Sequence, residues 1–211
     1  MSSMPKCLDI GNKPRKLRNE ICEDLSEFLV VFAHTVLYRF GGYSRGDFRD
    51  YSFAGRVQAK LCCDEHVVKY CQRSAHLANQ AMQKDNLENY EVSIEDGRGE
   101  SLVAFRVAFR RTPDFTNRTI RSLAEPELCT LRSNLGHVIH RLQSIVTSNE
   151  LHEKLNNTPT RLRIRLQLCN KQPKRLFKPT SEPILPPVLK PWTDIVRNEL
   201  SQLVFFAYFP S

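Results

Sequence analysis

Residues 161–168 (RLRIRLQL) constrain the fold more than any other stretch of the chain. Polar and aliphatic residues alternate strictly there, in the order Arg161, Leu162, Arg163, Ile164, Arg165, Leu166, Gln167, Leu168. Successive side chains of a strand point to opposite faces, so the pattern predicts a strand with one apolar face on a core and one cationic face. Such a strand needs pairing strands and a covering layer, and the rest of the chain is expected to supply both.

The length and composition are those of one globular domain. The chain has 211 residues, of which 41% are hydrophobic and 26% are charged, values typical of an ordered protein. The sequence shows no apolar run near the roughly 20 residues that span a bilayer and no apolar signal-peptide centre at its start. The seven cysteines are odd in number and lie mostly on apolar faces, as reduced thiols do. These features favour an intracellular protein.

Three segments have the apolar spacing of helices, and residues 1–18 indicate a flexible basic tail before them. Residues 19–40 are apolar almost all round, which predicts a largely buried helix that Gly41 and Gly42 end. Asp64 has the character of an N-cap for a helix reaching about residue 83. Residues 127–146 show the clearest one-sided spacing.

Strand patterns lie between the helices. Residues 51–61 predict an irregular strand with Gly55 as a bulge. Residues 89–95 and 102–109 alternate on either side of an Asp-Gly-Arg-Gly turn at 96–99, which predicts a hairpin. On its outer face Glu91 and Glu95 are expected opposite Arg106, Arg163 or Arg165. One sheet with helices on one side satisfies all these faces, so an α+β fold is predicted.

The C-terminal part of the chain differs from the rest. Residues 170–191 contain six prolines, which lack an amide donor and are excluded from the inside of a sheet ladder. The segment is nevertheless rich in apolar residues, and residues 202–209 (QLVFFAYF) are strongly β-prone. An extended segment that wraps the domain, or something held against it, is therefore expected.

The order of these segments resembles the HORMA domain family, and most of all the branch that contains the accessory subunit of translesion DNA polymerase zeta. The resemblance is carried by residues 25–48 (LSEFLVVFAHTVLYRFGGYSRGDF), 60–72 (KLCCDEHVVKYCQ), the hairpin, the 127–146 helix, RLRIRLQL, and 189–195 (LKPWTDI). It implies a three-helix layer on a mainly antiparallel sheet. Residues 19–169 would form the HORMA core, and 170–211 a C-terminal safety belt and terminal strand of the same domain.

The function that the resemblance implies is that of a non-enzymatic adaptor without a cofactor. It would clamp an extended peptide of the polymerase zeta catalytic subunit and bridge it to other translesion synthesis and DNA repair factors, in the nucleus and cytoplasm. A HORMA homodimer or heterodimer is a further implied partnership. The alternatives are a HORMA adaptor in spindle checkpoint, meiotic or autophagy signalling, and a basic nucleic-acid-binding domain.

The resemblance also assigns residues to surfaces. A translesion polymerase scaffold would bind at Leu185, Leu189, Gln202 and Phe205. His140 and Arg141 fall near an arginine that family members use for self-association. The alternative for His140 and Arg141 is that each is simply a polar residue on a helix face. Tyr70 matches a helix tyrosine that faces the partner peptide, although a half-buried helix aromatic is the plain alternative. The safety belt of that branch has a tryptophan that packs on the peptide and has no clear counterpart in this sequence. Phe177 is the nearest match to it. The implied peptide-binding residues are Tyr70, Leu162, Arg163, Ile164, Arg165, Leu166 and Phe177.

Other chemistries have weaker signals. The net charge of +8 suggests nucleic acid, but the basic residues are scattered and no nucleic-acid module is recognised. Cys62, Cys63, His66 and Cys71 lack the paired spacing of a structural zinc site. No glycine-rich phosphate loop or nucleophile and base pair appears. No catalytic, cofactor-binding or metal-binding residue is therefore assigned.

Overall fold

The computed structural model describes the backbone of residues 13–55, 57–84, 86–110, 125–169, 190–191, 196–198 and 201–208, and the side chains of 19–55, 57–84, 86–109 and 129–169. The N-terminal half contains α1 (Lys13–Phe40), a 3-10 turn (Arg45–Asp47), β1 (Phe48–Phe53), β2 (Val57–Cys62), α2 (Glu65–Gln83), β3 (Leu87–Glu95) and β4 (Ser101–Arg110). After it come α4 (Glu125–Gln143), α5 (Asn149–Asn157), β5 (Arg161–Leu168), β6 (Lys190–Pro191), β7 (Val196–Asn198) and β8 (Ser201–Tyr208).

Helix α1 is the centre of the core. Its side chains are buried on nearly every side, among them Phe28, Leu29, Phe32 and Val36 at 0–1% exposure, as its continuous apolar surface predicts. The helix begins at Lys13, earlier than the residue 19 expected from the sequence, so residues 13–18 are helical and are not a tail. Residues 1–12 lie outside the described residues. Gly42 follows the helix with φ +67°, a conformation that glycine adopts without strain.

The main sheet is antiparallel, in the strand order β5-β3-β4-β8-β6, with β7 also pairing β8. The predicted hairpin is confirmed: Tyr90 pairs with Val107 and Val92 with Phe105. In its turn the Asp96 carboxylate accepts the amides of Arg98 and Glu100, each at 2.9 Å. These bonds lower the pKa of the Asp96 carboxyl, and they explain why the chain reverses here.

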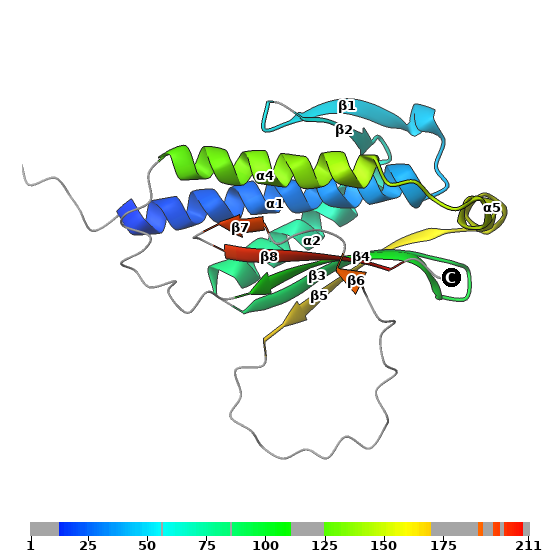
Figure 1. Ribbon diagram of the computed structural model, residues 1–211. Coiled ribbons are helices and arrows are strands. Elements are labelled where there is room, and N and C mark those ends of the chain that lie inside the picture. The colour runs from blue at the N-terminus through cyan, green and yellow to red at the C-terminus, as the bar shows by residue number, and fades with distance from the viewer. Residues whose placement is uncertain are drawn as a thin grey trace, which may run out of the picture.

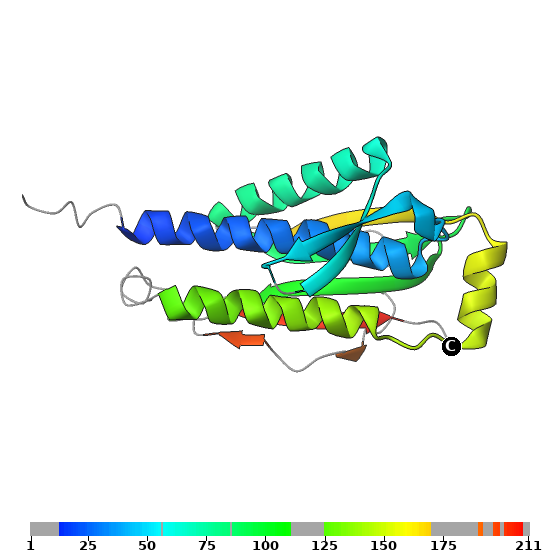
Figure 2. The same cartoon turned by 90° about the horizontal axis from the view of Figure 1, so that it is seen from above.

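The molecule has three layers. Helices α1, α2 and α4 cover one face of the sheet, and the β1–β2 hairpin lies on the opposite side of the helices (Figures 1 and 2). The inner side of the sheet contributes Tyr90, Val92, Phe105 and Ile164 to one core with α1. The predicted α+β arrangement, one sheet covered by helices on one face, is confirmed.

Two local predictions were wrong, and one helix was not predicted. Residues 51–61 form parts of two strands, β1 and β2, because Ala54 and Gly55 take positive φ values and turn the chain. The 127–146 helix ends at Gln143, and α5 follows it. Helix α5 has only Leu151 and Leu155 as buried residues, too few to give a helical pattern. Pro191 lies in β6 at the edge of the described sheet, which agrees with the expected exclusion of prolines from the inside of a sheet ladder.

Candidate functional site at the edge of the sheet

Strand β5 is an edge strand. It pairs antiparallel with β3, with Val92 opposite Ile164 and Ser93 opposite Arg163. Among the strands that the structure describes, it has no neighbour on its other side, and it forms the border of the sheet in Figure 1. The backbone of residues 161–168 therefore offers one side for a further strand.

The alternation along β5 has the predicted effect on burial. Ile164 is buried at 8% exposure, Leu162 and Leu166 are partly buried, and the three arginines are exposed. Leu168 belongs to the same apolar face but is 49% exposed. The sequence-based site stopped at Leu166, although the alternation itself continues to Leu168 and would have included it.

Helix α2 positions Tyr70 over this edge. Asp64 is the N-cap of this helix, as predicted. Its carboxylate accepts the backbone N–H groups of His66 at 2.8 Å and Val67 at 3.3 Å. One turn later, Tyr70 is 39% exposed, and its hydroxyl oxygen accepts the N–H of Ile164 at 2.9 Å. No sequence signal indicates this bond, because it joins residues 94 positions apart.

The Tyr70 bond fixes which backbone groups of β5 point away from the sheet. Amides of an antiparallel strand alternate in direction. Because the Ile164 N–H reaches Tyr70 and not β3, Leu162 and Leu166 also direct their backbone groups outward. We call the resulting area the edge surface, and it consists of Tyr70, Leu162, Ile164, Leu166 and Leu168.

The outer face of the sheet is a network of arginines and glutamates. Glu91 binds Arg106 at 2.6 Å and Arg165 at 3.3 Å. Glu95, only 1% exposed, binds Arg161 at 3.1 Å and also Arg165. The predicted pairing of these glutamates with Arg106 and Arg165 is confirmed, and Arg161 is an additional partner.

Arg163 was one of the three arginines considered as partners of these glutamates, and it is not opposite either of them. It lies opposite Ser93, its side chain is exposed, and the described residues give it no ion pair. The physical reason is the register: the glutamates lie opposite its neighbours Arg161 and Arg165, which occupy them.

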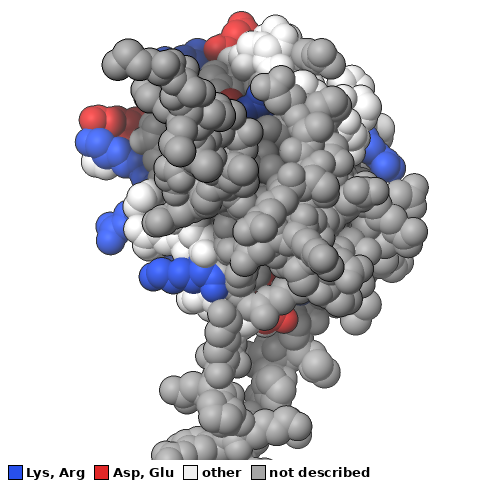
Figure 3. All heavy atoms as spheres, turned by 90° about the vertical axis from the view of Figure 1, so that its left-hand side faces the viewer, with Lys and Arg blue, Asp and Glu red and all other residues white. Residues whose placement is uncertain are grey.

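These pairs weaken the case for nucleic acid. Arg161 and Arg165 neutralise glutamates, so β5 does not present three available cations to phosphates. In Figure 3, the Lys and Arg side chains of the described residues that are visible at one end of the molecule stand in separate groups.

The remaining predicted residues are spread over the molecule. Gln202 and Phe205 lie in β8, where their backbones pair with Arg110 and Val107. β8 is three strands away from β5, which corresponds to about 14 Å. His140 and Arg141 are exposed in the last turn of α4, in the helical layer. Phe177, Leu185 and Leu189 lie outside the described residues.

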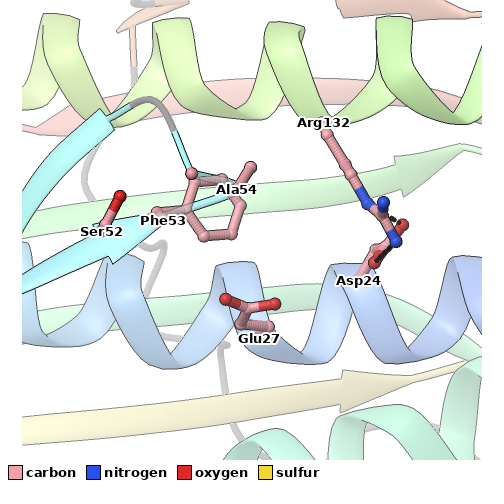
Figure 4. A pocket seen from close by; sticks show the side chains of 7 residues that line it. Asp24, Glu27, Ser52, Phe53, Ala54 and Arg132 are labelled. Carbon is pink, nitrogen blue, oxygen red and sulfur yellow. Dashed lines mark hydrogen bonds and ion pairs between the residues drawn. The ribbon is translucent and has the colours of Figure 1, made fainter.

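A hollow of about 310 Å³ lies between α1, α4 and the turn after β1, lined by Asp24, Glu27, Phe53 and Arg132 among others (Figure 4). Its charged side chains are already paired within the protein. Arg132 holds Asp24 through two bonds of 2.8 Å, and the Tyr51 hydroxyl donates to Glu27 at 2.6 Å. The hydrogen bond from Tyr51 to Glu27 is the main reason why the pKa of Tyr51 is raised to about 12. The three charged side chains that line the hollow are therefore already paired.

The cysteines and histidines do not converge either. Within the described ranges, no group of three His, Cys, Asp or Glu side chains could hold a metal ion. Cys62 and Cys71 are buried and Cys63 is exposed, all as thiols. Among the same residues, no helix has the length and apolarity needed to cross a membrane.

Neither a protein-family model nor a curated protein matches the sequence. Solved structures do match. A chain of the mitotic checkpoint complex has a TM-score of 0.69 at 11% identity, covering 91% of this chain and 99% of that chain. HTP-1 of C. elegans bound to the HIM-3 closure motif has a TM-score of 0.60 at 12% identity, covering 93% and 96%. HTP-1 bound to HTP-3 motif-1 has a TM-score of 0.57 at 12% identity, covering 92% and 94%. The chain thus has the α+β HORMA fold.

Proposed function

We propose that this protein is a non-enzymatic HORMA adaptor that captures an extended peptide as an added strand beside β5. The observation that carries the proposal is the open side of β5, with its backbone groups directed outward and its apolar face uncovered toward Leu168. Strand addition uses these two features: main-chain hydrogen bonds supply affinity and alternate side chains supply selectivity. The solved structures of HTP-1 bound to the HIM-3 closure motif and to HTP-3 motif-1 support a peptide ligand.

The partner that we propose is an extended segment of the DNA polymerase zeta catalytic subunit. The support is the ordered sequence resemblance to the accessory subunits of that polymerase, from residues 25–48 to 189–195. The proposed second partner is a translesion polymerase scaffold bound at Gln202 and Phe205 of β8. Because β8 and β5 are separated by β3 and β4, two partners could bind together, and the protein would act as a bridge in DNA repair in the nucleus.

A HORMA adaptor of checkpoint or meiotic signalling is the second candidate, favoured by the likeness to a chain of the mitotic checkpoint complex and to HTP-1. The two candidates differ in the peptide that binds and share the site. Purification of the protein from cells, followed by identification of the bound chains, separates them. Recovery of a polymerase catalytic subunit supports the first, and recovery of checkpoint or meiotic proteins supports the second.

The direct test uses fragments of about 20 residues from the polymerase zeta catalytic subunit. A fragment that binds only the folded protein, at a free concentration 100 times its Kd, stabilises the folded state by about 2.7 kcal/mol. This stabilisation raises the melting temperature. Leu166→Asp places a charge on the edge surface and should abolish the rise. His152→Asp places the same charge on an exposed position of α5 and should preserve it. If no fragment changes the melting temperature of the folded protein, the polymerase assignment fails.

A further inference from the structure

The middle of β5 holds a guanidinium group for which the described residues supply no carboxylate. Arg161 and Arg165, on either side of Arg163, bind Glu95, and Arg165 also binds Glu91. Arg163 lies on the same face, between these two arginines, with Ser93 opposite. Three like charges in a row on one strand repel each other, and two of the three are compensated.

Ser93 cannot supply the missing charge, and its hydroxyl is already occupied. The side chain is 0% exposed, receives a bond from Arg165 at 3.0 Å, and directs its hydroxyl at the Arg163 carbonyl at 3.5 Å. Glu91 and Glu95 each already hold two guanidinium groups. The nearest position from which a new carboxylate could reach Arg163 is therefore on the open side of β5, where an added strand would lie.

We propose that the peptide that adds to β5 carries an Asp or Glu opposite Arg163, with apolar residues immediately before and after it. This inference rests on the proposed function and specifies its ligand. On a paired strand, the residue directly opposite has its Cβ about 4.5–5.5 Å away, within reach of an ion pair. The neighbours of that residue point to the other face, beside Tyr70, Leu162 and Leu166, where an apolar side chain is favoured.

The segment that follows β5 in the same chain matches this ligand poorly, because it is basic. Residues 170–191 contain five Lys and Arg residues and a single acidic residue, Glu182. Adding this segment to β5 would bring further positive charge to an arginine face. An acidic peptide from another protein instead gains attraction from both the strand and the basic sequence that follows it.

The test is a selection from a displayed library of random 12-residue peptides, carried out on three folded proteins: the wild type, Arg163→Glu and Arg98→Glu. Arg98 is exposed in the β3–β4 turn, so its variant is a control for net charge. Wild type and Arg98→Glu should enrich an Asp or Glu flanked by apolar residues. Arg163→Glu should enrich Lys or Arg at the same position.

A selected peptide is then measured with its acidic residue changed to Lys. The change should weaken binding to the wild type roughly two- to fivefold, the range of an exposed cross-strand ion pair, and should strengthen binding to Arg163→Glu. Selected peptides without an acidic position, or without a switch in Arg163→Glu, overturn this inference and leave strand capture intact. Failure to select any peptide on the wild type overturns strand capture itself.

One variant tests the internal alternative. If Glu182 of the same chain were the partner of Arg163, Glu182→Lys would raise the affinity for selected acidic peptides by releasing the arginine. Arg163→Glu would then abolish that gain. An unchanged affinity in Glu182→Lys supports the external carboxylate, and a gain of fivefold or more overturns it.

Discussion

At the scale of single residues, the Tyr70 hydroxyl occupies the Ile164 amide that an added strand would use. The side chain thus has two parts with opposite effects on a guest: a half-exposed ring that offers apolar contact, and a hydroxyl that competes for the backbone. A guest carbonyl that takes the Ile164 N–H has to displace the hydroxyl, whose bond is worth about 0.5–1.5 kcal/mol.

Tyr70→Phe and Tyr70→Ala should therefore have opposite effects on peptide binding. The phenylalanine keeps the ring and removes the competing hydroxyl, so affinity should stay equal or rise by up to about tenfold. The alanine removes the ring contact, and affinity should fall by about tenfold or more. Fluorescence anisotropy with one selected peptide measures both. Equal losses in the two variants would show that the hydroxyl itself binds the guest.

His34 is a second residue whose role appears only in the folded chain. It is 1% exposed in α1, and its Nδ1 accepts the N–H of Cys62 in β2 at 3.1 Å. Burial, and to a smaller extent the positive charge of Arg49, lowers the pKa of His34 to about 4. The imidazole is thus neutral at physiological pH, and it joins the central helix to the hairpin.

This histidine should make the protein less stable in acid. Because the folded pKa is below the ordinary 6.5, the unfolded chain takes up the proton first. The stabilisation is complete above pH 6.5 and is lost as the pH falls toward 4, by about 3 kcal/mol. Urea unfolding at pH 7, 5.5 and 4 measures it. His34→Gln, which can accept the same bond without titrating, should show a loss smaller by about that amount. If the free energy of unfolding fell equally with pH in the wild type and in His34→Gln, His34 would not be the cause of the acid sensitivity.

At the scale of elements, α4 and the β1–β2 hairpin approach each other closely at Gly136. A Cβ at this position would lie 2.7 Å from Cγ2 of Val57 in β2, well inside van der Waals contact. Gln143 of the same helix also donates to the Gln58 carbonyl at 2.8 Å. The glycine is therefore a packing requirement of this interface.

Gly136→Ala should destabilise the protein although alanine is the better helix former. Overpacking costs about 1–3 kcal/mol, and the gain in helix propensity returns about 1 kcal/mol. In a Val57→Ala background the clash is removed, so the same substitution should stabilise by about 0.5–1 kcal/mol. Denaturant unfolding of the four proteins of this cycle measures the coupling. An identical effect in both backgrounds would mean that Val57 is not the obstacle.

At the scale of the whole molecule, the two borders of the β5-β3-β4 unit are treated differently. β8 pairs with β4 from Ala104 to Arg110 and closes that border, whereas β5 has no described neighbour on its outer side. Long unpaired borders attract other chains. The proposed capture of a peptide is therefore expected on one side of the described sheet.

Deletion of residues 201–208 should open the second border. The loss of several backbone hydrogen bonds at about 1 kcal/mol each should lower the free energy of unfolding by about 3 kcal/mol or more, and the exposed β4 edge should promote self-association. Light scattering and urea unfolding measure the two effects. Deletion of residues 209–211 is the control and should change neither. A monomeric, equally stable protein lacking β8 would contradict this role.

The sequence predicts most of the local structure because the signals are local. The alternation at 161–168, the Asp64 cap and the Asp96–Gly99 turn each lie within a few residues, and each is found in the structure. The predictions failed where the local signal was short or ambiguous. Ala54 takes a positive φ, which no pattern announces, and α5 buries only two leucines.

The apolar and cationic faces of β5 follow from the amino-acid order alone, since side-chain alternation is a property of any strand. Three features follow from the folded arrangement alone: β5 borders the described part of the sheet, the Tyr70 hydroxyl accepts the Ile164 amide, and no described carboxylate pairs with Arg163 as with its two neighbours. These features depend on strand order and register between residues some 70 to 94 positions apart. Contacts over such separations are fixed by the packing of the whole core, and a local pattern carries no information about them.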